Sequence, residues 1–225
     1  MYICISVIFL IKTSMDIGNN IFTDIPERNI NNIFTDIMQA IEINFGPKDY
    51  TFRFCGIILS DEAPNIYFPS GFSKKNIQIR ITHNCEYNLK HAVYQVAHEA
   101  IHLLSPGLKG TSTYLEEGLA TFFAHLYTNK KYGEIHIGDK KYALAADMAK
   151  TLLVNNISGI KQMREKEPNL SQITSQMLVE YYPSLPIELL DALTTNFQEK
   201  LPFMDCKQSP IPLYILSCHL LSLPS

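Results

Sequence analysis

The chain contains 225 residues, of which 46% are hydrophobic, 11% are aromatic and 18% are charged. The hydrophobic fraction is too high for an intrinsically disordered protein. The net charge of −3, from 19 Lys and Arg against 22 Asp and Glu, is too small for a protein that coats nucleic acid. At this length we expect a soluble globular protein with one domain, or one domain in two lobes.

The first 14 residues form an apolar leader that ends near Ile11. This leader lacks the basic start and the small-residue cleavage site of a signal peptide. Its apolar run is also too short for a bilayer, which requires ~20 residues. A buried strand, or a true start at Met15, explains the leader better. We therefore expect a cytoplasmic protein, with secretion or membrane anchoring through residues 2–11 as the alternative.

The rest of the chain is predicted to be a single domain over residues 15–205, followed by an apolar tail over residues 206–225. Pro212 interrupts the tail, which is too short for a transmembrane helix and is predicted to pack on the protein. The five cysteines contain no CxxC pair, so we expect free thiols in a reducing compartment and no disulfide framework or zinc knuckle. They are Cys4, Cys55, Cys85, Cys206 and Cys218.

A seven-residue sequence occurs twice near the N-terminus, at Asn19–Ile25 and again at Asn31–Ile37. Two copies are too few for a repeat architecture, so we interpret them as a local duplication within a helical segment. The second copy continues into an amphipathic helix, which should end before Gly46 and Pro47.

Strands are predicted next, and helices after them. Residues 50–59 and 65–68 are rich in aromatic and β-branched side chains, and the alternation in residues 76–82 is typical of a sheet with one solvated face. This order predicts an α+β fold with a small, mainly antiparallel sheet in the N-terminal half and a helical C-terminal half. The predicted helices are 88–104, 113–129, 142–155, 157–166, 171–181 and 186–198.

The helix at 88–104 contains an HExxH motif, His98-Glu-Ala-Ile-His102. Two histidines four residues apart share one face of a helix, so both imidazoles can reach one zinc ion. Glu99, beside the first histidine, can hold a metal-activated water and accept its proton. The alternative is that the two histidines are exposed, or are satisfied by other polar groups.

A catalytic zinc ion usually has three protein ligands and one open position. No third histidine closely follows His102, and the next helix begins with Thr113 and continues through Glu116 and Glu117. Thr113 and Glu116 have the spacing of a capping box, which predicts a structural role for Glu116. Glu117 projects in a different direction and is predicted to face the two histidines. A solvated glutamate in the first helical turn is the alternative.

The sequence HEAIH followed by LEEGLATFFA resembles the gluzincin metallopeptidases, whose aminopeptidase branch carries an N-E-G-[FL]-A-type motif on a second helix. The resemblance covers about 35 residues. It implies a zincin-like fold, with the metal-binding helix between the sheet and the helical half. It also implies one Zn²⁺ per chain, bound by His98, His102 and Glu117, with Glu99 as the general base. An edge strand, here Ile77–Thr82, would pair with an extended peptide.

The sequence also departs from the aminopeptidases. Only 15 positions separate His102 from Glu117 (117 − 102), which is shorter than their spacing, and their Gly-x-Met-x-Asn strand is absent. Exopeptidase specificity is therefore not implied. In the family a downstream tyrosine often stabilises the oxyanion. Tyr181 and Tyr182 are candidates for this role, with packing at a helix end as the alternative.

Together these features predict zinc-dependent hydrolysis of a peptide or protein substrate. The alternative is a catalytically inactive zincin-like module with a binding or regulatory role. We expect no nucleic-acid partner and no membrane association, while the cleavage specificity and oligomeric state stay open. Three other histidines are weaker candidates, either as alternative ligands or as groups that hydrogen-bond to the ligands. They are His91, His125 and His136.

Overall fold

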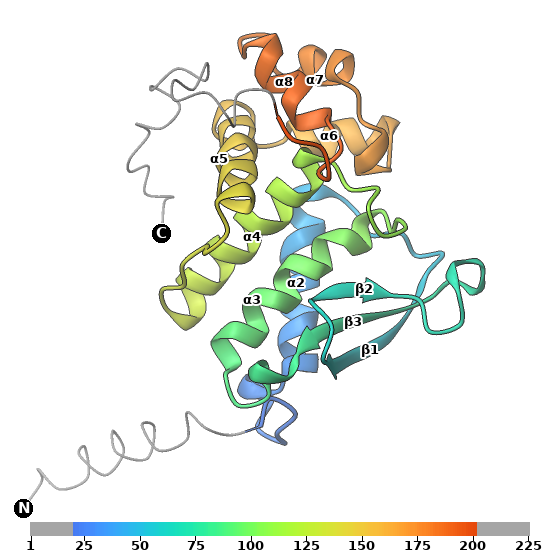
Figure 1. The fold of residues 1–225 in the computed structure, drawn as a ribbon, viewed down its shortest axis with the longest axis vertical. Coiled ribbons are helices and arrows are strands. Elements are labelled where there is room, and N and C mark those ends of the chain that lie inside the picture. The colour runs from blue at the N-terminus through green and yellow to red at the C-terminus, as the bar shows by residue number, and fades with distance from the viewer. Residues whose placement is uncertain (1–19, 202–225) are drawn as a thin grey trace, which may run out of the picture. The chain divides into compact units, whose positions relative to one another are not determined.

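The structure, a computed structural model, describes residues 20–201 (Figure 1). The leader at 1–14 and the tail at 206–225 therefore lie outside the described residues, and the predictions made for them stay predictions. Of the cysteines within the described range, Cys55 is exposed and Cys85 is buried, and both are free thiols as predicted.

The chain forms two compact units. The first unit comprises the described residues up to Ala40, together with 50–100 and 124–135, and the second comprises 41–49, 101–123 and the described residues from His136 onward. Three helices pass from one unit into the other, because the boundaries fall after Ala40, Ala100 and Phe123. That residues 15–205 form a single domain stays a prediction.

The first unit contains a three-stranded sheet with strand order β1-β3-β2. The strands are β1 (Arg53–Ser60), β2 (Asn65–Tyr67) and β3 (Asn76–Thr82). β2 and β3 are antiparallel, as predicted, whereas β1 and β3 are parallel. The chain reverses direction after β1 to form β2, and it reverses again to form β3, which lies between the other two strands. β3 therefore runs parallel to β1 and antiparallel to β2, and the sheet is mixed. The predicted α+β class is confirmed.

The prediction that Ile77–Thr82 is an edge strand is wrong. These residues belong to β3, which lies between β1 and β2 and is hydrogen-bonded on both sides. A central strand has no open edge to which a peptide could add. The alternation of β3 correctly identified its buried face, since Ile77, Ile79 and Ile81 are at most 1% exposed. Alternation reports the two faces of a strand and carries no information about its neighbours.

The two copies of the duplicated sequence differ in structure. The second copy lies within α2 (Ile30–Phe45), which ends directly before Gly46 as predicted. In the first copy, the described residues 20–25 form turns, so the helical interpretation is wrong there. Pro26 follows this copy directly and disfavours a helical conformation at Ile25, which is extended, with φ −78° and ψ 112°.

The HExxH motif lies where the sequence predicts it, at the end of a helix that follows the sheet. α3 (Leu89–Ile101) continues as the 3₁₀ helix η5 (His102–Leu104). Within the first unit, the middle of α3 is tied to the end of β3. The Thr82 backbone N–H donates to Gln95 Oε1 at 2.9 Å, and Gln95 Nε2 donates to Thr82 Oγ1 at 2.9 Å. The core-facing stripe of α3 and η5 is buried at Val93, Val96, Ala97, Ala100 and Leu104, each at most 1% exposed.

The C-terminal half is helical, as predicted. The predicted helix at 171–181 divides into η6 (Leu170–Gln172) and α7 (Ser175–Tyr181). No helix among residues 20–201 is long and apolar enough to cross a membrane. The other helices are α4 (Tyr114–Tyr132), α5 (Lys140–Asn155), α6 (Gly159–Lys166) and α8 (Ile187–Thr194).

Within the second unit, α4 and α5 pack closely at Gly118. A Cβ atom at this position would overlap the backbone oxygen of Ala145 and would lie 3.1 Å from the Cβ of Ala149. Only glycine therefore allows this approach of the two helices. Gly118 directly follows Glu117, so the packing fixes the part of α4 that carries the candidate ligand.

The second unit also contains a buried arginine. Arg164, on α6, is 6% exposed and donates hydrogen bonds to four backbone carbonyl oxygens at 2.6–3.2 Å. Burial lowers its pKa to about 10, so it remains a cation at neutral pH. The four acceptors belong to Phe45, Pro47, Leu104 and Pro168. Phe45 and Leu104 are the last residues of α2 and η5, and the two prolines follow α2 and α6 by two residues.

Candidate metal centre

Buried polar side chains gather around the HExxH motif. Eight polar or charged residues are buried among residues 20–201, and five of these eight come from the end of α3, from η5 and from the start of α4. A buried charged group is unfavourable unless it is paired or binds a metal ion. This concentration therefore marks a candidate functional site. The five are Glu99, His102, Thr113, Glu116 and Glu117.

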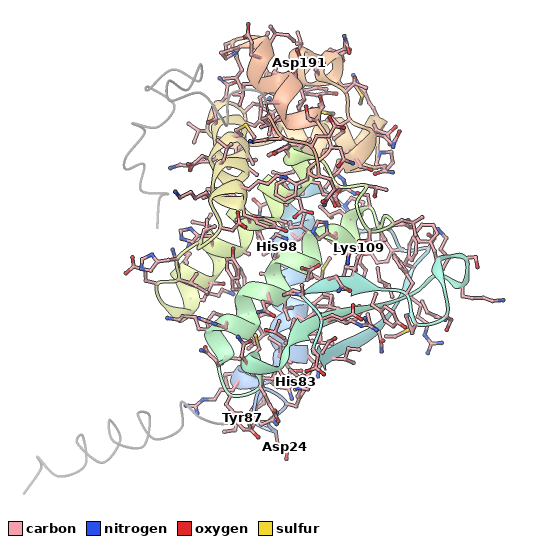
Figure 2. All side chains as sticks on the ribbon, in the orientation of Figure 1. Asp24, His83, Tyr87, His98, Lys109 and Asp191 are labelled. Carbon is pink, nitrogen blue, oxygen red and sulfur yellow. The ribbon has the colours of Figure 1, made fainter. Side chains whose placement is uncertain are left out.

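Three of the predicted site residues form one group. Ligand atoms of His98, His102 and Glu117 all lie within 4.8 Å of one another. His98, labelled in Figure 2, is half-buried on α3, while His102 and Glu117 are 7% and 8% exposed. Among residues 20–201 no other group of three or more such side chains could hold a metal ion. The alternative of a solvated Glu117 is excluded by its burial.

The donor set and its spacing fit a single metal ion. Two atoms bound to one tetrahedral zinc ion at 2.0–2.2 Å lie about 3.3–3.6 Å apart. His102 Nε2 and Glu117 Oε1 are 3.8 Å apart, close to that separation, and the whole group, whose ligand atoms lie within 4.8 Å of one another, requires a modest contraction. Two imidazoles and one carboxylate also suit other first-row metal ions. The residues therefore form a candidate metal site, and the identity of the ion belongs to the proposal below.

The orientation of His102 is set by a neighbour of the third ligand. Its Nδ1 atom lies 2.7 Å from Glu116 Oε1. A carboxylate only accepts hydrogen bonds, so the imidazole Nδ1–H donates to Glu116. In the neutral ring this leaves the lone pair on Nε2, the atom that lies on the Glu117 side. The side chain thus presents the correct nitrogen to a metal ion.

Glu116 is the site residue whose role the sequence reasoning missed. The capping-box spacing predicts a structural role, and its backbone N–H does donate to Thr113 Oγ1 at 3.4 Å. Its carboxylate, however, contacts His102 on another segment of the chain. The only signal in the sequence is a second acid directly before the candidate ligand, and periodicity alone cannot reveal what that acid contacts.

Glu99 is buried on α3 beside the first ligand. It is 5% exposed, so its carboxylate is held inside the protein and does not lie on a solvated helix face.

Tyr94 lies one helical turn before His98, and burial raises its pKa to about 12. Its phenol is therefore protonated at neutral pH and can donate a hydrogen bond.

The weaker candidate ligands stay outside the metal group. His91 and His136 are exposed, whereas His125 is half-buried and its Nε2 lies 3.1 Å from Asn129 Nδ2 on the same helix. None of the three belongs to the group formed by the HExxH histidines and Glu117.

The two tyrosine candidates differ in their surroundings. Tyr182 is 0% exposed, and its hydroxyl donates to the backbone oxygen of Asn156 at 3.3 Å. Burial raises its pKa. These contacts favour the packing role for Tyr182. Tyr181 is half-buried at the end of α7, and Lys166 Nζ lies 5.2 Å from the centre of its ring.

Comparisons with protein families, with curated proteins and with solved structures found no match for this chain. The resemblance to gluzincins therefore rests on the residues of two helical segments. Fold and site together define the class: an α+β protein with a buried His-His-Glu group that could bind one metal ion.

Proposed function

We propose that this protein is a zinc-dependent peptidase. The observation that carries the proposal is the convergence of His98, His102 and Glu117, whose ligand atoms lie within 4.8 Å of one another next to an HExxH glutamate. Two histidines and one glutamate are the ligand set of several catalytic zinc sites, which keep a further position open for water or substrate. A purely structural zinc site would instead have four protein ligands.

The chemistry divides between the ion and the protein. A bound zinc ion supplies Lewis acidity, which strengthens water as an acid near neutral pH and polarises a carbonyl group. Glu99 accepts a proton from the attacking water, so that hydroxide adds to the carbonyl carbon. When the C–N bond breaks, Glu99 returns the proton to the leaving amine. The net change is the addition of one water molecule across the peptide bond.

The mixed sheet suggests where a peptide could bind. An extended peptide adds to an open strand edge through main-chain hydrogen bonds. β3 is central, so the candidates become the edge strands β1 and β2, which lie in the same unit as His98 and Glu99. β2 is supported from β3, because the guanidinium carbon of Arg80 lies 3.3 Å from the centre of the Tyr67 ring.

The test combines metal content with peptide cleavage. Protein purified without chelator should contain about one zinc per chain and should cleave members of a peptide library. Glu99→Gln should keep the zinc and lose the cleavage, because an amide cannot accept the proton. Glu165→Gln, at an exposed position on α6, is the matched control and should cleave like the unmodified chain.

Two other results would point elsewhere. Cleavage by Glu99→Gln at the unmodified rate would show that the mechanism is wrong. Stoichiometric zinc without cleavage of any peptide would favour the alternative function, a zincin-like binding or regulatory module.

A further inference from the structure

Glu116 lies outside the ligand group but contacts one of its members. Its side chain is 6% exposed and that of His102 is 8% exposed. The distance of 2.7 Å between Glu116 Oε1 and His102 Nδ1 is short for a hydrogen bond from nitrogen to oxygen. Water competes little for a contact that is buried this deeply, so the pair holds a defined orientation.

The start of α4 explains how two consecutive acids reach two different atoms of the same imidazole. Successive residues on a helix point about 100° apart, so Glu116 and Glu117 cannot bind in the same way. Glu116 meets His102 Nδ1, while Glu117 Oε1 lies 3.8 Å from Nε2. Thr113 fixes this turn through two bonds: its Oγ1 accepts from the Glu116 N–H, and its carbonyl accepts from the Glu117 N–H at 3.1 Å.

A neutral imidazole exists as two tautomers, and only one of them leaves the Nε2 lone pair available for coordination. A carboxylate at Nδ1 stabilises that tautomer, holds the ring plane and makes Nε2 a better electron donor. Without the carboxylate, an ion binding at Nε2 would have to select both the tautomer and the ring rotation. Part of the binding free energy would be lost in doing so.

We propose that Glu116 is a positioning residue, which sets the tautomer and orientation of His102 and thereby increases the affinity of the centre for zinc. This inference rests on the metal-binding part of the proposed function and is independent of peptide hydrolysis.

The competing explanation is that Glu116 and His102 form a structural pair that joins η5 to the start of α4. The two roles predict different measurements. A structural pair would stabilise the zinc-free chain and leave zinc affinity unchanged. A positioning residue would change zinc affinity, and a variant that keeps a hydrogen-bonding oxygen would have a smaller effect than one that removes the group.

The experiment measures the Zn²⁺ affinity of the full chain by competition with a fluorescent chelator. Glu116→Gln and Glu116→Ala are compared with the unmodified protein, and Glu165→Ala serves as the matched control. Glu165→Ala removes the same kind of side chain from an exposed position on α6, away from the His102 contact. Loss of an outer partner of a metal-bound histidine typically costs 10–100-fold in affinity. We expect about 10-fold weaker binding for Glu116→Gln and about 100-fold for Glu116→Ala.

The control and two further readouts complete the design. Glu165→Ala should bind zinc within about twofold of the unmodified chain, because the His102 contact is intact. Thermal melting of the zinc-free variants checks that each one folds. The d–d absorption of Co²⁺-loaded protein should change in Glu116→Ala and stay the same in Glu165→Ala, since that spectrum reports the ligand field at the ion.

The inference is overturned if both Glu116 variants bind zinc as tightly as the unmodified chain, or if Glu165→Ala weakens binding as much as Glu116→Ala. It is also overturned if the unmodified chain binds no zinc. Zinc binding that depends on Glu116, in a chain that cleaves no peptide, supports the inference and contradicts the peptidase proposal. Cleavage with unchanged zinc affinity in the Glu116 variants supports the peptidase and rejects the role of Glu116.

Discussion

Arg164 and the His98–His102–Glu117 group show two ways in which this protein accommodates buried charge. Arg164 is a cation surrounded by four backbone oxygens, two of which end helical segments, at Phe45 and Leu104. Helix C-termini carry partial negative charge, so these oxygens suit a cation. The metal group has the opposite composition, because its members and their buried ionisable neighbours are histidines and glutamates, and none of them is a Lys or Arg.

The difference separates a structural centre from a functional one. The chain itself supplies every partner that Arg164 uses in its four bonds, so this centre is complete once the protein folds. The centre that contains His98, His102 and Glu117 combines imidazole nitrogens with a carboxylate, the donor types that bind a divalent cation. Substitutions at Arg164 should therefore act on folding, whereas substitutions at the other centre should act on metal binding.

The largest effect on stability is expected for Arg164→Met. Methionine fills much of the volume but leaves four carbonyl oxygens without their donor, and each buried unsatisfied group costs about 1–3 kcal/mol before relaxation. We expect the free energy of unfolding to fall by about 3–5 kcal/mol, as when one partner of a buried polar pair is removed. Urea denaturation of the zinc-free chain measures this change.

Two details make the Arg164 prediction specific. Arg164→Lys keeps the charge but has no planar fork to reach several oxygens, so its loss should be intermediate. Burial lowers the pKa of Arg164 only to about 10, so the group is charged in both the folded and the unfolded chain below pH 9. The destabilisation should therefore be constant between about pH 6 and 9. If adding zinc restored the free energy of unfolding of Arg164→Met, this result would contradict the separation of the two centres.

Zinc removal should give the next largest loss of stability, and this loss should depend on the residues of the metal centre alone. A ligand at 100 times its dissociation constant stabilises the folded state by about 2.7 kcal/mol. Melting with zinc and with chelator should show this difference in the unmodified chain and in Arg164→Lys. Glu117→Ala should lose most of it, because a ligand is missing. An equal zinc-dependent shift in Glu117→Ala would remove Glu117 from the site.

Much of the metal centre could be predicted from the sequence because its signals are local. The histidine spacing of HExxH fixes a shared helix face, and the capping signal at Thr113 fixes the phase of the next helix, which placed Glu117 correctly. The contact between Glu116 and His102 could not be predicted, because it depends on how two helical segments meet.

The fold shows the same limit. The strands, the helices and the α+β class followed from periodicity and from the Gly- and Pro-bearing breaks. Strand neighbours did not, since β3 has the same alternation whether it is central or at an edge. The duplicated sequence shows that the same seven residues can differ in structure, because Pro26 disfavours a helical conformation at Ile25 in the first copy, whereas the second copy lies within α2.

Gly118→Ala should have a smaller effect that begins in packing and reaches the metal centre. The added methyl group would overlap the Ala145 backbone oxygen, so α4 and α5 must separate. Overpacking of this kind typically costs about 1–3 kcal/mol. Glu117 is the adjacent residue, so zinc affinity should fall as well. Ala120→Gly, two positions further along α4, is a control that changes helix propensity without adding volume, and it should leave zinc affinity unchanged.

Tyr182→Phe should have the smallest effect on stability. This variant tests whether Tyr182 acts on folding, as Arg164 does, or acts at the metal centre. The substitution removes only the hydroxyl, which donates to the Asn156 oxygen at 3.3 Å and lies close to Gly159. Loss of one such hydrogen bond costs about 0.5–1.5 kcal/mol, so the melting temperature should fall slightly. If Tyr182 has the packing role, peptide cleavage stays within about twofold, whereas removing an oxyanion donor would lower kcat by about 100- to 1,000-fold. Steady-state kinetics with one cleaved peptide, with Tyr181→Phe measured in parallel, therefore decides whether Tyr182 acts with Arg164 in folding or with the metal ligands in catalysis.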